Sequence, residues 1–359
     1  MNGLVLYPDS NYQLEKVSDP KLGENVFSPE DVLIEVALCG VCGSDIHHWG
    51  DKSGLAGPPK PVVTGHEITG TIRAVGPKVK ELAPGDRVGC EIVTFYCGYC
   101  VNCRSGRYNI CVNTPPMEGR AHYITGGGFA PLVIWPAKHL HKLPDNIAFE
   151  EAVLMEPTAG AVHTLIERLK LSPGESVAIL GPGARGLILT QIARTLGANP
   201  IMVTGISRDE EIRFSMAKKM GADRTVNVEK EDLLAQAYDL TDGNGFDVVV
   251  ENSGSSAAVL QAIDLARPGG RIMISGGGIR GGITTNIDTR KLIVKELDLL
   301  GEISHNWTSW RIALSLIKQG KINLKPLLTE IFPLEKWETA FEAAKTSNQV
   351  IRVALNPRL

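Results

Sequence analysis

The sequence has no apolar run that approaches the roughly 18 residues of a membrane-spanning helix, so we expect no transmembrane segment. Its first residues, MNGLVLYPDSNYQLEKV, lack the basic stretch and apolar core of a secretory signal. Lys and Arg do not cluster, and a net charge of −3 argues against a nucleic-acid partner. Internal repeats and low-complexity tracts are also missing. These absences predict a cytoplasmic protein, and 359 residues suffice for two domains.

Cysteine is scarce outside one short stretch, CGYCVNCRSGRYNIC, which holds four of the seven cysteines. A cytoplasmic protein keeps its thiols reduced, and the first three are too close together to pair comfortably as disulfides. Four thiolates can instead surround one zinc ion and leave no open position. The stretch therefore predicts a structural zinc site with the ligands Cys97, Cys100, Cys103 and Cys111. Cys39 and Cys90 lie in strand-like runs and are predicted to be core thiols.

Two patterns divide the chain. Up to about Met155, short alternating runs such as DVLIEVALCG are broken by Gly and Pro, which predicts an antiparallel, barrel-like β domain. From Glu156, short apolar strands alternate with amphipathic helices, which predicts a doubly wound parallel sheet and an α/β fold. We assign residues 1–155 and 296–359 to the first domain, with the cysteine lobe at about 91–115, and residues 156–295 to the second.

A glycine-rich turn follows the first strand of the second pattern, in SVAILGPGARG. Gly181 permits a tight turn, Gly183 lets the backbone approach a pyrophosphate, and Gly186 allows close packing of helix on strand. The N-terminus of the next helix then faces the phosphates. The predicted cofactor-binding residues of this turn are Gly181, Gly183, Ala184, Arg185 and Gly186, with Arg185 reaching towards a cofactor phosphate.

The end of the next strand, PIMVTG, bears on the choice of cofactor. NAD enzymes usually place an acidic residue here, which binds the ribose 2′-hydroxyl. Gly205 instead leaves room for a 2′-phosphate, and Ser207 and Arg208 could bind it, so NADP(H) is favoured. Asp209 follows directly, and a small change of loop path would bring it to the ribose of NAD(H). Both cofactors stay open at this stage.

A second metal site is indicated by residues from three stretches, CGVCGSDIHHWG, TGHE and LMEPTAGAVH. One cysteine, one histidine and one glutamate form a mixed zinc site with a fourth position free for water or alcohol, which is the catalytic arrangement. The candidates are Cys42, His66, Glu67 and Glu156, the last at the junction of the two patterns.

Over essentially its full length the chain resembles the zinc-containing medium-chain alcohol dehydrogenases, above all their polyol (sorbitol or L-iditol) and threonine dehydrogenase branches. The motifs GHE and MEP, the four-cysteine lobe and the glycine turn carry this resemblance together. It implies a GroES-like catalytic domain, a Rossmann cofactor domain and two zinc ions per chain. The implied reaction is reversible hydride transfer between a secondary alcohol and NAD(P). It also implies a homodimer or homotetramer, joined through the strand near Leu297 to Glu302.

The same resemblance implies roles for individual residues. Cys42 and His66 would bind the catalytic zinc with either Glu67 or Glu156 as the third ligand, the other glutamate holding water. Ser44 would begin a proton relay that ends at His47. Asp45 would orient His66, because a metal-bound imidazole usually donates its second N–H to a carboxylate or carbonyl. Trp49 could line the substrate pocket or belong to the core.

Two departures from the family pattern leave the substrate open. Phe95 and Tyr96 stand where the threonine branch has a histidine before its lobe. GEISHNWTSW replaces an arginine–tyrosine pair of the polyol branch, so Glu302 and His305 become candidates for substrate contact. A polyol is the leading expectation, with threonine or a diol as the alternative. A relative that binds a nucleotide without catalysis is the third possibility, although such proteins typically lack the open metal site.

Overall fold

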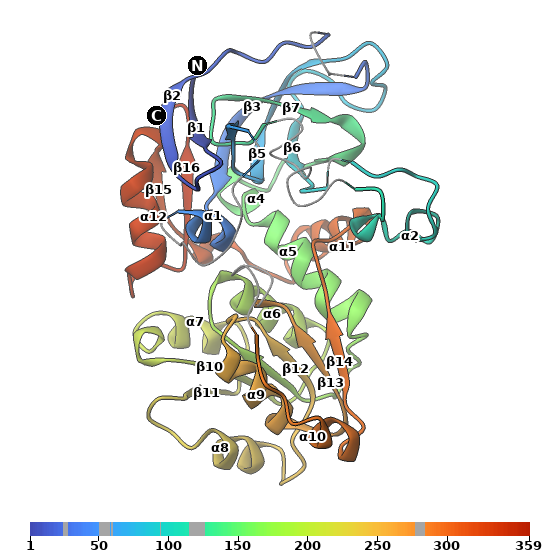
Figure 1. Cartoon of the computed structure of the whole chain (residues 1–359), viewed down its shortest axis with the longest axis vertical. Coiled ribbons are helices and arrows are strands. Elements are labelled where there is room, and N and C mark those ends of the chain that lie inside the picture. Colours follow the sequence, from blue (N-terminus) through green and yellow to red (C-terminus); the bar gives the residue numbers. More distant parts are fainter. Residues whose placement is uncertain (24–27, 50–57, 59, 94, 115–125, 277–283) are drawn as a thin grey trace. The chain divides into compact units, whose positions relative to one another are not determined.

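The computed structural model describes residues 1–23, 28–49, 58, 60–93, 95–114, 126–276 and 284–359 (Figure 1). Contacts divide the chain into two compact units. The first comprises Met1–Ala159, Ser304–Ser347 and Arg352–Leu359, and the second comprises Gly160–Ile303 and Asn348–Ile351. The sequence placed the boundaries after residues 155 and 295, four and eight residues earlier, and it placed Asn348–Ile351 in the first domain. Across the described ranges, no helix combines the length and the apolar character needed to cross a membrane.

The first unit contains a seven-stranded sheet, as far as the described residues extend. Its neighbours pair antiparallel except β15 with β16, which run parallel. In order, the strands are β15 (Leu328–Pro333), β16 (Arg352–Asn356), β3 (Asp31–Gly40), β5 (Glu67–Val75), β6 (Arg87–Cys90) and β8 (Leu140–Lys142), with β7 (Leu132–Pro136) also paired to β3. A smaller sheet has the order β2 (Tyr12–Lys16), β1 (Asn2–Leu6), β4 (Val62–Val63).

Strand β3 is the centre of the large sheet, because it pairs with β5, β7 and β16. The face predicted from its alternation is buried, with Val32, Ile34 and Val36 fully covered. Cys39 and Cys90 are also fully buried, which confirms them as core thiols. The helical segments of this unit are α1 (Gly43–His48), α2 (Val101–Arg104), η1 (Tyr108–Ile110), η3 (Ala137–His139), α4 (Phe149–Ala152), α11 (Trp307–Lys318), η7 (Lys325–Leu327), η8 (Leu334–Lys336) and α12 (Trp337–Thr346).

One continuous helical stretch contains the division between the units. Helix α5 (Met155–Val162) runs into the π-helical segment η4 (His163–Arg168), and the contact boundary falls within α5. The wide π turn is closed by the hydrogen bond from Leu169 N–H to Thr164 O at 2.9 Å. Such turns are rare and are frequent at functional sites.

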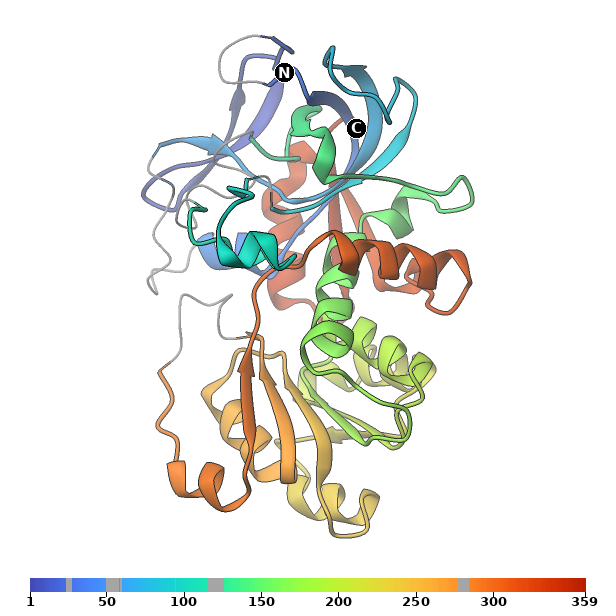
Figure 2. The same cartoon turned by 90° about the vertical axis from the view of Figure 1, so that its right-hand side faces the viewer.

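The second unit is the predicted doubly wound parallel sheet (Figure 2). Its strand order is β11 (Arg224–Asn227), β10 (Ile201–Gly205), β9 (Val177–Leu180), β12 (Phe246–Glu251), β13 (Ala266–Ile274) and β14 (Asp298–Gly301), and every neighbouring pair is parallel. The strand order reverses between β9 and β12, where such folds bind ligands outside the carboxyl ends of the strands. Figure 2 shows β14 in deep orange at the edge of this sheet.

Helices cover the parallel sheet in two groups. Helix α6 (Ala184–Thr195) contacts α7 (Arg213–Lys219), and this pair packs on β9, β10 and β11. Helix α8 (Leu233–Leu240) contacts α9 (Ser256–Leu265), which packs on β12 and β13. Helix α10 (Thr289–Val294) precedes β14, and the short η5 (Ser207–Asp209) follows β10. The packed helices therefore support the strands, and with them the residues that follow each strand at the carboxyl edge of the sheet.

Candidate metal and dinucleotide sites

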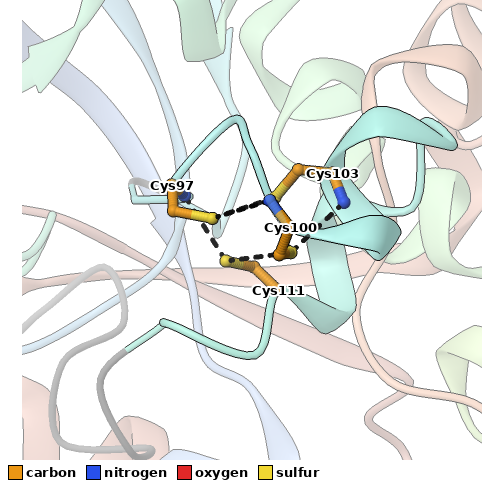
Figure 3. A group of neighbouring side chains, drawn as sticks. All are labelled: Cys97, Cys100, Cys103 and Cys111. Carbon is orange, nitrogen blue, oxygen red and sulfur yellow. Dashed lines mark hydrogen bonds between the residues drawn. The ribbon is translucent and has the colours of Figure 1, made fainter.

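The four-cysteine lobe gathers its sulfur atoms around one point (Figure 3). Cys100 caps α2, Cys103 lies within it, and Cys111 follows η1, so two short helical turns place three of the thiols. All four Sγ atoms lie within 4.8 Å of one another. The Sγ–Sγ distances include 3.4 Å for Cys100–Cys103, 3.9 Å for Cys97–Cys103 and 4.0 Å for Cys100–Cys111. A tetrahedron of four zinc-bound sulfurs has edges of about 3.8 Å, so this group fits the ion.

Hydrogen bonds outweigh burial and lower the pKa of Cys97 and of Cys111, whereas burial and hydrogen bonds with the neighbouring cysteines raise the pKa of Cys103 to about 12. Backbone N–H groups donate to sulfur from Cys100 to Cys97 at 3.3 Å and from Cys97 to Cys111 at 3.4 Å. Desolvation alone would raise the pKa of Cys97, but hydrogen bonds from the Asn113 side chain and from backbone N–H groups lower that pKa to about 6. All seven cysteines of the chain lie in described segments and carry free thiols. The lobe is therefore a set of four convergent donors rather than a pair of disulfides.

The second cluster is assembled from two neighbouring strands. Cys42 follows β3 and caps α1, while His66 precedes Glu67, the first residue of β5. Because Gly40 of β3 is paired with Glu67 of β5, the three side chains meet at the same end of the two strands. One donor atom from each of Cys42, His66 and Glu67 lies within 4.8 Å of the other two. Sulfur, imidazole and carboxylate together are a donor set that zinc accepts in catalytic sites.

The charged groups of this cluster shift the pKa values of Cys42 and His66. Burial by itself would raise the pKa of the Cys42 thiol, but the neighbouring His66 outweighs burial and lowers it. For His66, burial alone would lower the pKa, whereas the Cys42 thiolate and the carboxylates of Asp45 and Glu156 raise it to about 9. The pKa of the thiol is thus lowered and that of the imidazole raised by the charge of the other. The negative groups that raise the pKa of His66 would also attract a divalent cation.

Glu67 presents one occupied and one unoccupied oxygen. Its Oε1 accepts from Nη2 of Arg352, in β16, and the Glu67 side chain is 1% exposed. Its Oε2 is buried and has no hydrogen-bond partner in the described parts of the chain. A Cβ on Gly40 would collide with this oxygen, so the glycine makes room for the carboxylate. A buried, unsatisfied carboxylate oxygen beside a thiol and an imidazole is what a cation site requires.

Glu156 lies outside the compact set of three. It is the second residue of α5, and its Oε1 is 3.6 Å from Nδ1 of the fully buried His305. Its charge still reaches the cluster, as its contribution to the raised pKa of His66 shows. Of the two glutamates that the sequence left open, Glu67 is the one that converges with Cys42 and His66.

Helix α1 carries the residues of the predicted proton relay. Ser44 and His47 are three positions apart and therefore neighbours on one helix face, and both are half-buried. The Asp45 carboxylate is buried and accepts the Cys42 N–H at 2.8 Å, so it fixes the turn that presents the Cys42 thiol. Burial raises the pKa of Asp45. His48 Nδ1 lies 2.9 Å from the carbonyl oxygen of Ser44.

The glycine turn has the expected conformation. Gly181 follows β9 with φ of +110°, a left-handed value that side chains disfavour, and Gly183 caps α6. A Cβ on Gly186 would collide with the carbonyl oxygen of Gly181, so this glycine permits close packing of helix on strand. Helix α6 begins at Ala184 and its free N–H groups form an anion site. The sequence therefore predicted the local geometry of a dinucleotide turn.

Gly205 ends β10 and is followed by a short turn in which Asp209 is buried and Arg208 is exposed. Asp209 is 4% exposed; its two oxygens accept from the Ile206 N–H at 3.0 Å and from Arg213 Nη1 at 2.8 Å. Its carboxylate therefore caps the turn. The Arg208 side chain is 41% exposed. Ser207 donates its backbone N–H to Glu229 at 2.9 Å, which brings a carboxylate to the same turn.

Arg185 has partners other than those predicted. Its guanidinium pairs with Glu302 and donates to Asn252 Oδ1 and Thr164 Oγ1, both at 2.7 Å. Both oxygens of Glu302 accept hydrogen bonds within the second unit, and its side chain is 5% exposed. The expected substrate contact of Glu302 therefore finds no support, because the carboxylate is occupied by its own fold.

The structure shows the contacts of three further residues, which the sequence left open or did not predict. Arg352, which holds Glu67, was not predicted, and its signal was a single charge within the apolar strand QVIRVAL. Trp49 makes edge contacts with Trp337 and Phe341, with ring centroids 6.0 and 5.7 Å apart, so of the two predicted roles packing is the observed one. Tyr96 stacks on Tyr108 at 4.6 Å, which places it against the cysteine lobe.

Comparison with known proteins places the chain in a family. Residues 28–145 match the alcohol dehydrogenase GroES-like domain, and residues 185–319 match the zinc-binding dehydrogenase domain. The chain is 36% identical to D-arabitol-phosphate dehydrogenase of Enterococcus avium, with 91% of each protein covered. It is 35% identical to L-threonine 3-dehydrogenase of Pyrococcus furiosus, with 96% of this chain and 95% of the relative covered.

Solved structures agree. A zinc-binding dehydrogenase of Sinorhizobium meliloti, solved with NADP, superimposes with a TM-score of 0.83 at 27% identity, and 99% of each chain is covered. Both predicted domains, the GroES-like one and the doubly wound one, are therefore confirmed as fold types. The chain belongs to the zinc-containing medium-chain alcohol dehydrogenase family.

Proposed function

We propose that this oxidoreductase uses a zinc ion held by Cys42, His66 and Glu67 to transfer hydride between a secondary alcohol of the polyol class and NADP(H). The observation that carries the proposal is the convergence of these three donors within 4.8 Å. Three protein donors leave a coordination position for an alcohol, in contrast to the four sulfurs of the lobe. When bound, zinc supplies Lewis acidity that lowers the pKa of an alcohol hydroxyl.

In this proposal Glu67 is the third zinc ligand, and Glu156 stays outside the coordination shell. Glu67 Oε2 accepts no hydrogen bond from the described residues, whereas Glu156 is next to His305. Arg352 forms an ion pair with Glu67 and so offsets part of its negative charge. With zinc bound, the Cys42 thiolate and the Glu67 carboxylate would balance the two positive charges of the ion. Glu156 and His305 then remain available to orient a substrate hydroxyl.

The chain's own residues provide a route for the alcohol proton. Ser44 follows the thiolate ligand by two positions, so its Oγ is placed to accept the hydroxyl proton and pass its own to the His47 imidazole. The two side chains share a helix face and are half-buried, which allows contact with both substrate and solvent. His48 is bound to the Ser44 carbonyl and has no part in this route.

NADP(H) is the proposed cofactor, because Gly205 adds no carboxylate of its own and Arg208 exposes a guanidinium there. Asp209, which could have served NAD(H), is turned inward to Arg213. The dehydrogenase of Sinorhizobium meliloti was solved with NADP, which supports the choice. Glu229 opposes it, since its carboxylate already accepts the Ser207 N–H. The balance between Arg208 and Glu229 therefore sets the preference.

Two variants test the cofactor assignment through the ratio of NADPH to NADH affinity. Arg208→Ala should lower this ratio by about tenfold, because a charged hydrogen bond to the 2′-phosphate is lost. Glu229→Gln should raise the ratio, because a repelling charge is removed. Arg224→Ala, which breaks an exposed pair with Asp239 at 2.7 Å, is the control and should leave the ratio unchanged. Equal losses for both cofactors in Arg208→Ala would reject the 2′-phosphate contact.

The substrate class is tested by turnover on polyols, polyol phosphates, diols, sugar acids and threonine, each with NAD and NADP. We expect the highest kcat/KM on a polyol or its phosphate, in line with the arabitol-phosphate dehydrogenase among the relatives. Highest activity on threonine would assign the chain to the other branch, which the threonine dehydrogenase relative represents. No turnover on any alcohol by zinc-loaded protein would contradict the proposal.

We also propose an assembly and a location for the chain. Strand β14 is the edge of the parallel sheet and three of its four residues are exposed, so we propose that a second copy pairs there to form a homodimer or homotetramer. The exposed Ile293 and Val294 of the preceding helix would be covered by the same contact. Four unpaired thiolates for a second, structural zinc suit a reducing compartment, and we therefore infer the cytoplasm.

A further inference from the structure

The side chain of Arg185 connects the glycine turn to distant parts of the second unit. Arg185 is the second residue of α6, so its backbone lies in the turn that receives phosphates. Its guanidinium donates to Asn252 Oδ1 at 2.7 Å and is bonded to Ser275 Oγ and Glu302 Oε1. A phosphate contact was expected of this arginine, but its donors are committed elsewhere.

The three partners share a position in the fold. Asn252 directly follows β12, Ser275 directly follows β13, and Glu302 directly follows β14. They are therefore the first residues beyond three adjacent strands, all at the carboxyl edge of the sheet. A dinucleotide on this fold places its phosphates at the β9 turn and its first ribose at the end of β10. The nicotinamide half consequently crosses the edge formed by β12, β13 and β14.

Both carboxylate oxygens of Glu302 accept hydrogen bonds. Glu302 Oε1 accepts from Ser275 at 2.7 Å, in addition to Arg185, and Oε2 accepts from Thr164 at 2.6 Å. Thr164 belongs to the π-helical turn and also accepts from Arg185 Nη2 at 2.7 Å. With both members largely buried, a charged pair of this kind resists separation, because breaking it leaves one charge uncompensated. The network is rigid for that reason.

We propose that Arg185 is a positioning residue for hydride transfer, which fixes the segments beneath the nicotinamide half at a set distance from the phosphate-binding turn. The inference rests on the proposed function, since it requires a nicotinamide dinucleotide across this edge. Arg185 acts through Glu302, Ser275 and Asn252 and touches no reacting atom. Lysine cannot replace it, because a single ammonium does not offer the planar fork that reaches partners on both sides.

The test compares two ligands on one double variant. Arg185→Met combined with Glu302→Met removes both charges and keeps similar volume, a replacement that buried pairs often tolerate without loss of stability. NADPH and 2′-phospho-ADP-ribose share the adenosine half and the pyrophosphate, and only NADPH has the nicotinamide. Arg194→Met is the matched control, because Arg194 is in the same helix and pairs with Asp223 at 2.5 Å, near the helix end.

We expect the double variant to bind NADPH about tenfold more weakly and to transfer hydride about tenfold more slowly in a single turnover, as a misplaced reactant would. Its affinity for 2′-phospho-ADP-ribose should equal that of the wild type. Without any ligand, amide hydrogen exchange at Ser275 and Glu302 should be faster. Arg185→Lys should show the same pattern, and Arg194→Met none of it.

Three outcomes would overturn the proposal. An equal loss for both ligands would mean that Arg185 binds a phosphate directly. Wild-type binding, hydride transfer and exchange in the double variant would mean that the network has no positioning role. Failure of the wild-type protein itself to bind NADPH and NADH would instead reject the proposed function, and the inference with it.

Discussion

The two candidate metal clusters are equally compact and are built in opposite ways. In the lobe, four sulfurs come from one segment of the chain, Cys97 to Cys111, and backbone N–H groups stabilise them. In the second cluster, sulfur, nitrogen and oxygen come from two strands, and charged side chains surround them. Four protein donors close a zinc site, whereas three leave a position open for a reactant. On this comparison we propose a stabilising ion in the lobe and a catalytic ion in the second cluster.

The surroundings strengthen this distinction. Around Cys42 and His66, the buried Asp45 and the partly buried Arg352 and Glu156 each shift a pKa of the cluster. Around the lobe, the exposed side chains of Tyr99 and Val101 show that one side faces solvent. A charged shell tunes the ligands of a reactive metal, while a structural metal needs only convergent thiolates. Variants in the two clusters should therefore affect different properties.

The largest effect is expected from His66→Ala. It removes one of three donors, so turnover should fall by about 10³-fold or more, because the remaining two donors hold zinc poorly. NADPH binding and the far-ultraviolet circular dichroism spectrum should stay like those of the wild type. Steady-state kinetics with metal-verified protein are the measurement. Activity above a tenth of the wild-type value would remove His66 from the site.

In contrast to His66→Ala, Cys100→Ala should lower stability and leave turnover largely unchanged. Losing one of four thiolates releases the lobe zinc, whose binding energy contributes to folding, so the midpoint of thermal unfolding should fall by several degrees. At low temperature kcat/KM should remain within about threefold of the wild type, because the reactive cluster is intact. Cys90→Ala is the control, since it truncates a buried core thiol and should reduce stability without loss of zinc. Equal heat stability of Cys100→Ala and wild type would argue against a structural ion.

A smaller, pH-dependent effect is expected at Glu91, which joins the lobe to the large sheet. Its buried carboxylate accepts from Tyr108 of the lobe at 2.7 Å and lies 3.1 Å from His139 Nδ1 and 2.6 Å from His141 Nε2. Burial by itself would raise the pKa of Glu91, but hydrogen bonds from the two histidines lower it to about 2. Burial, together with the charges of Lys138 and His141, lowers the pKa of His139.

Because the pKa of Glu91 is lowered on folding, its contribution to stability is fully present above about pH 4.5 and is lost as the pH falls towards about 2. Glu91→Gln should reduce the free energy of unfolding at pH 7 by about 3 kcal/mol, and this difference from wild type should shrink below about pH 4.5. Urea unfolding at several pH values measures it. Glu35→Gln, which breaks an exposed pair with Arg358 at 3.1 Å, should cost less than about 1 kcal/mol at every pH. A pH-independent Glu91→Gln difference would show that the carboxylate is not ionised in the fold.

The sequence predicted the features that depend on local chain geometry. The cysteine spacing determines the lobe, the glycine spacing determines the turn before α6, and alternation determines the buried face of β3. Contacts between distant segments were not predictable in this way. Arg352 is 285 residues from Glu67, and Arg185 is 117 residues from Glu302. A lone charge in an apolar strand, or in a glycine turn, signals such a partner without identifying it.

The measurement that tests the account most directly is the zinc content of three proteins, combined with X-ray absorption at the zinc edge. We expect two zinc ions per chain in the wild type, one in His66→Ala with a shell of sulfur alone, and one in Cys100→Ala with a mixed shell of sulfur and lighter atoms. A single ion in the wild type with four sulfur neighbours would contradict the account, because the cluster of Cys42, His66 and Glu67 would then hold no metal.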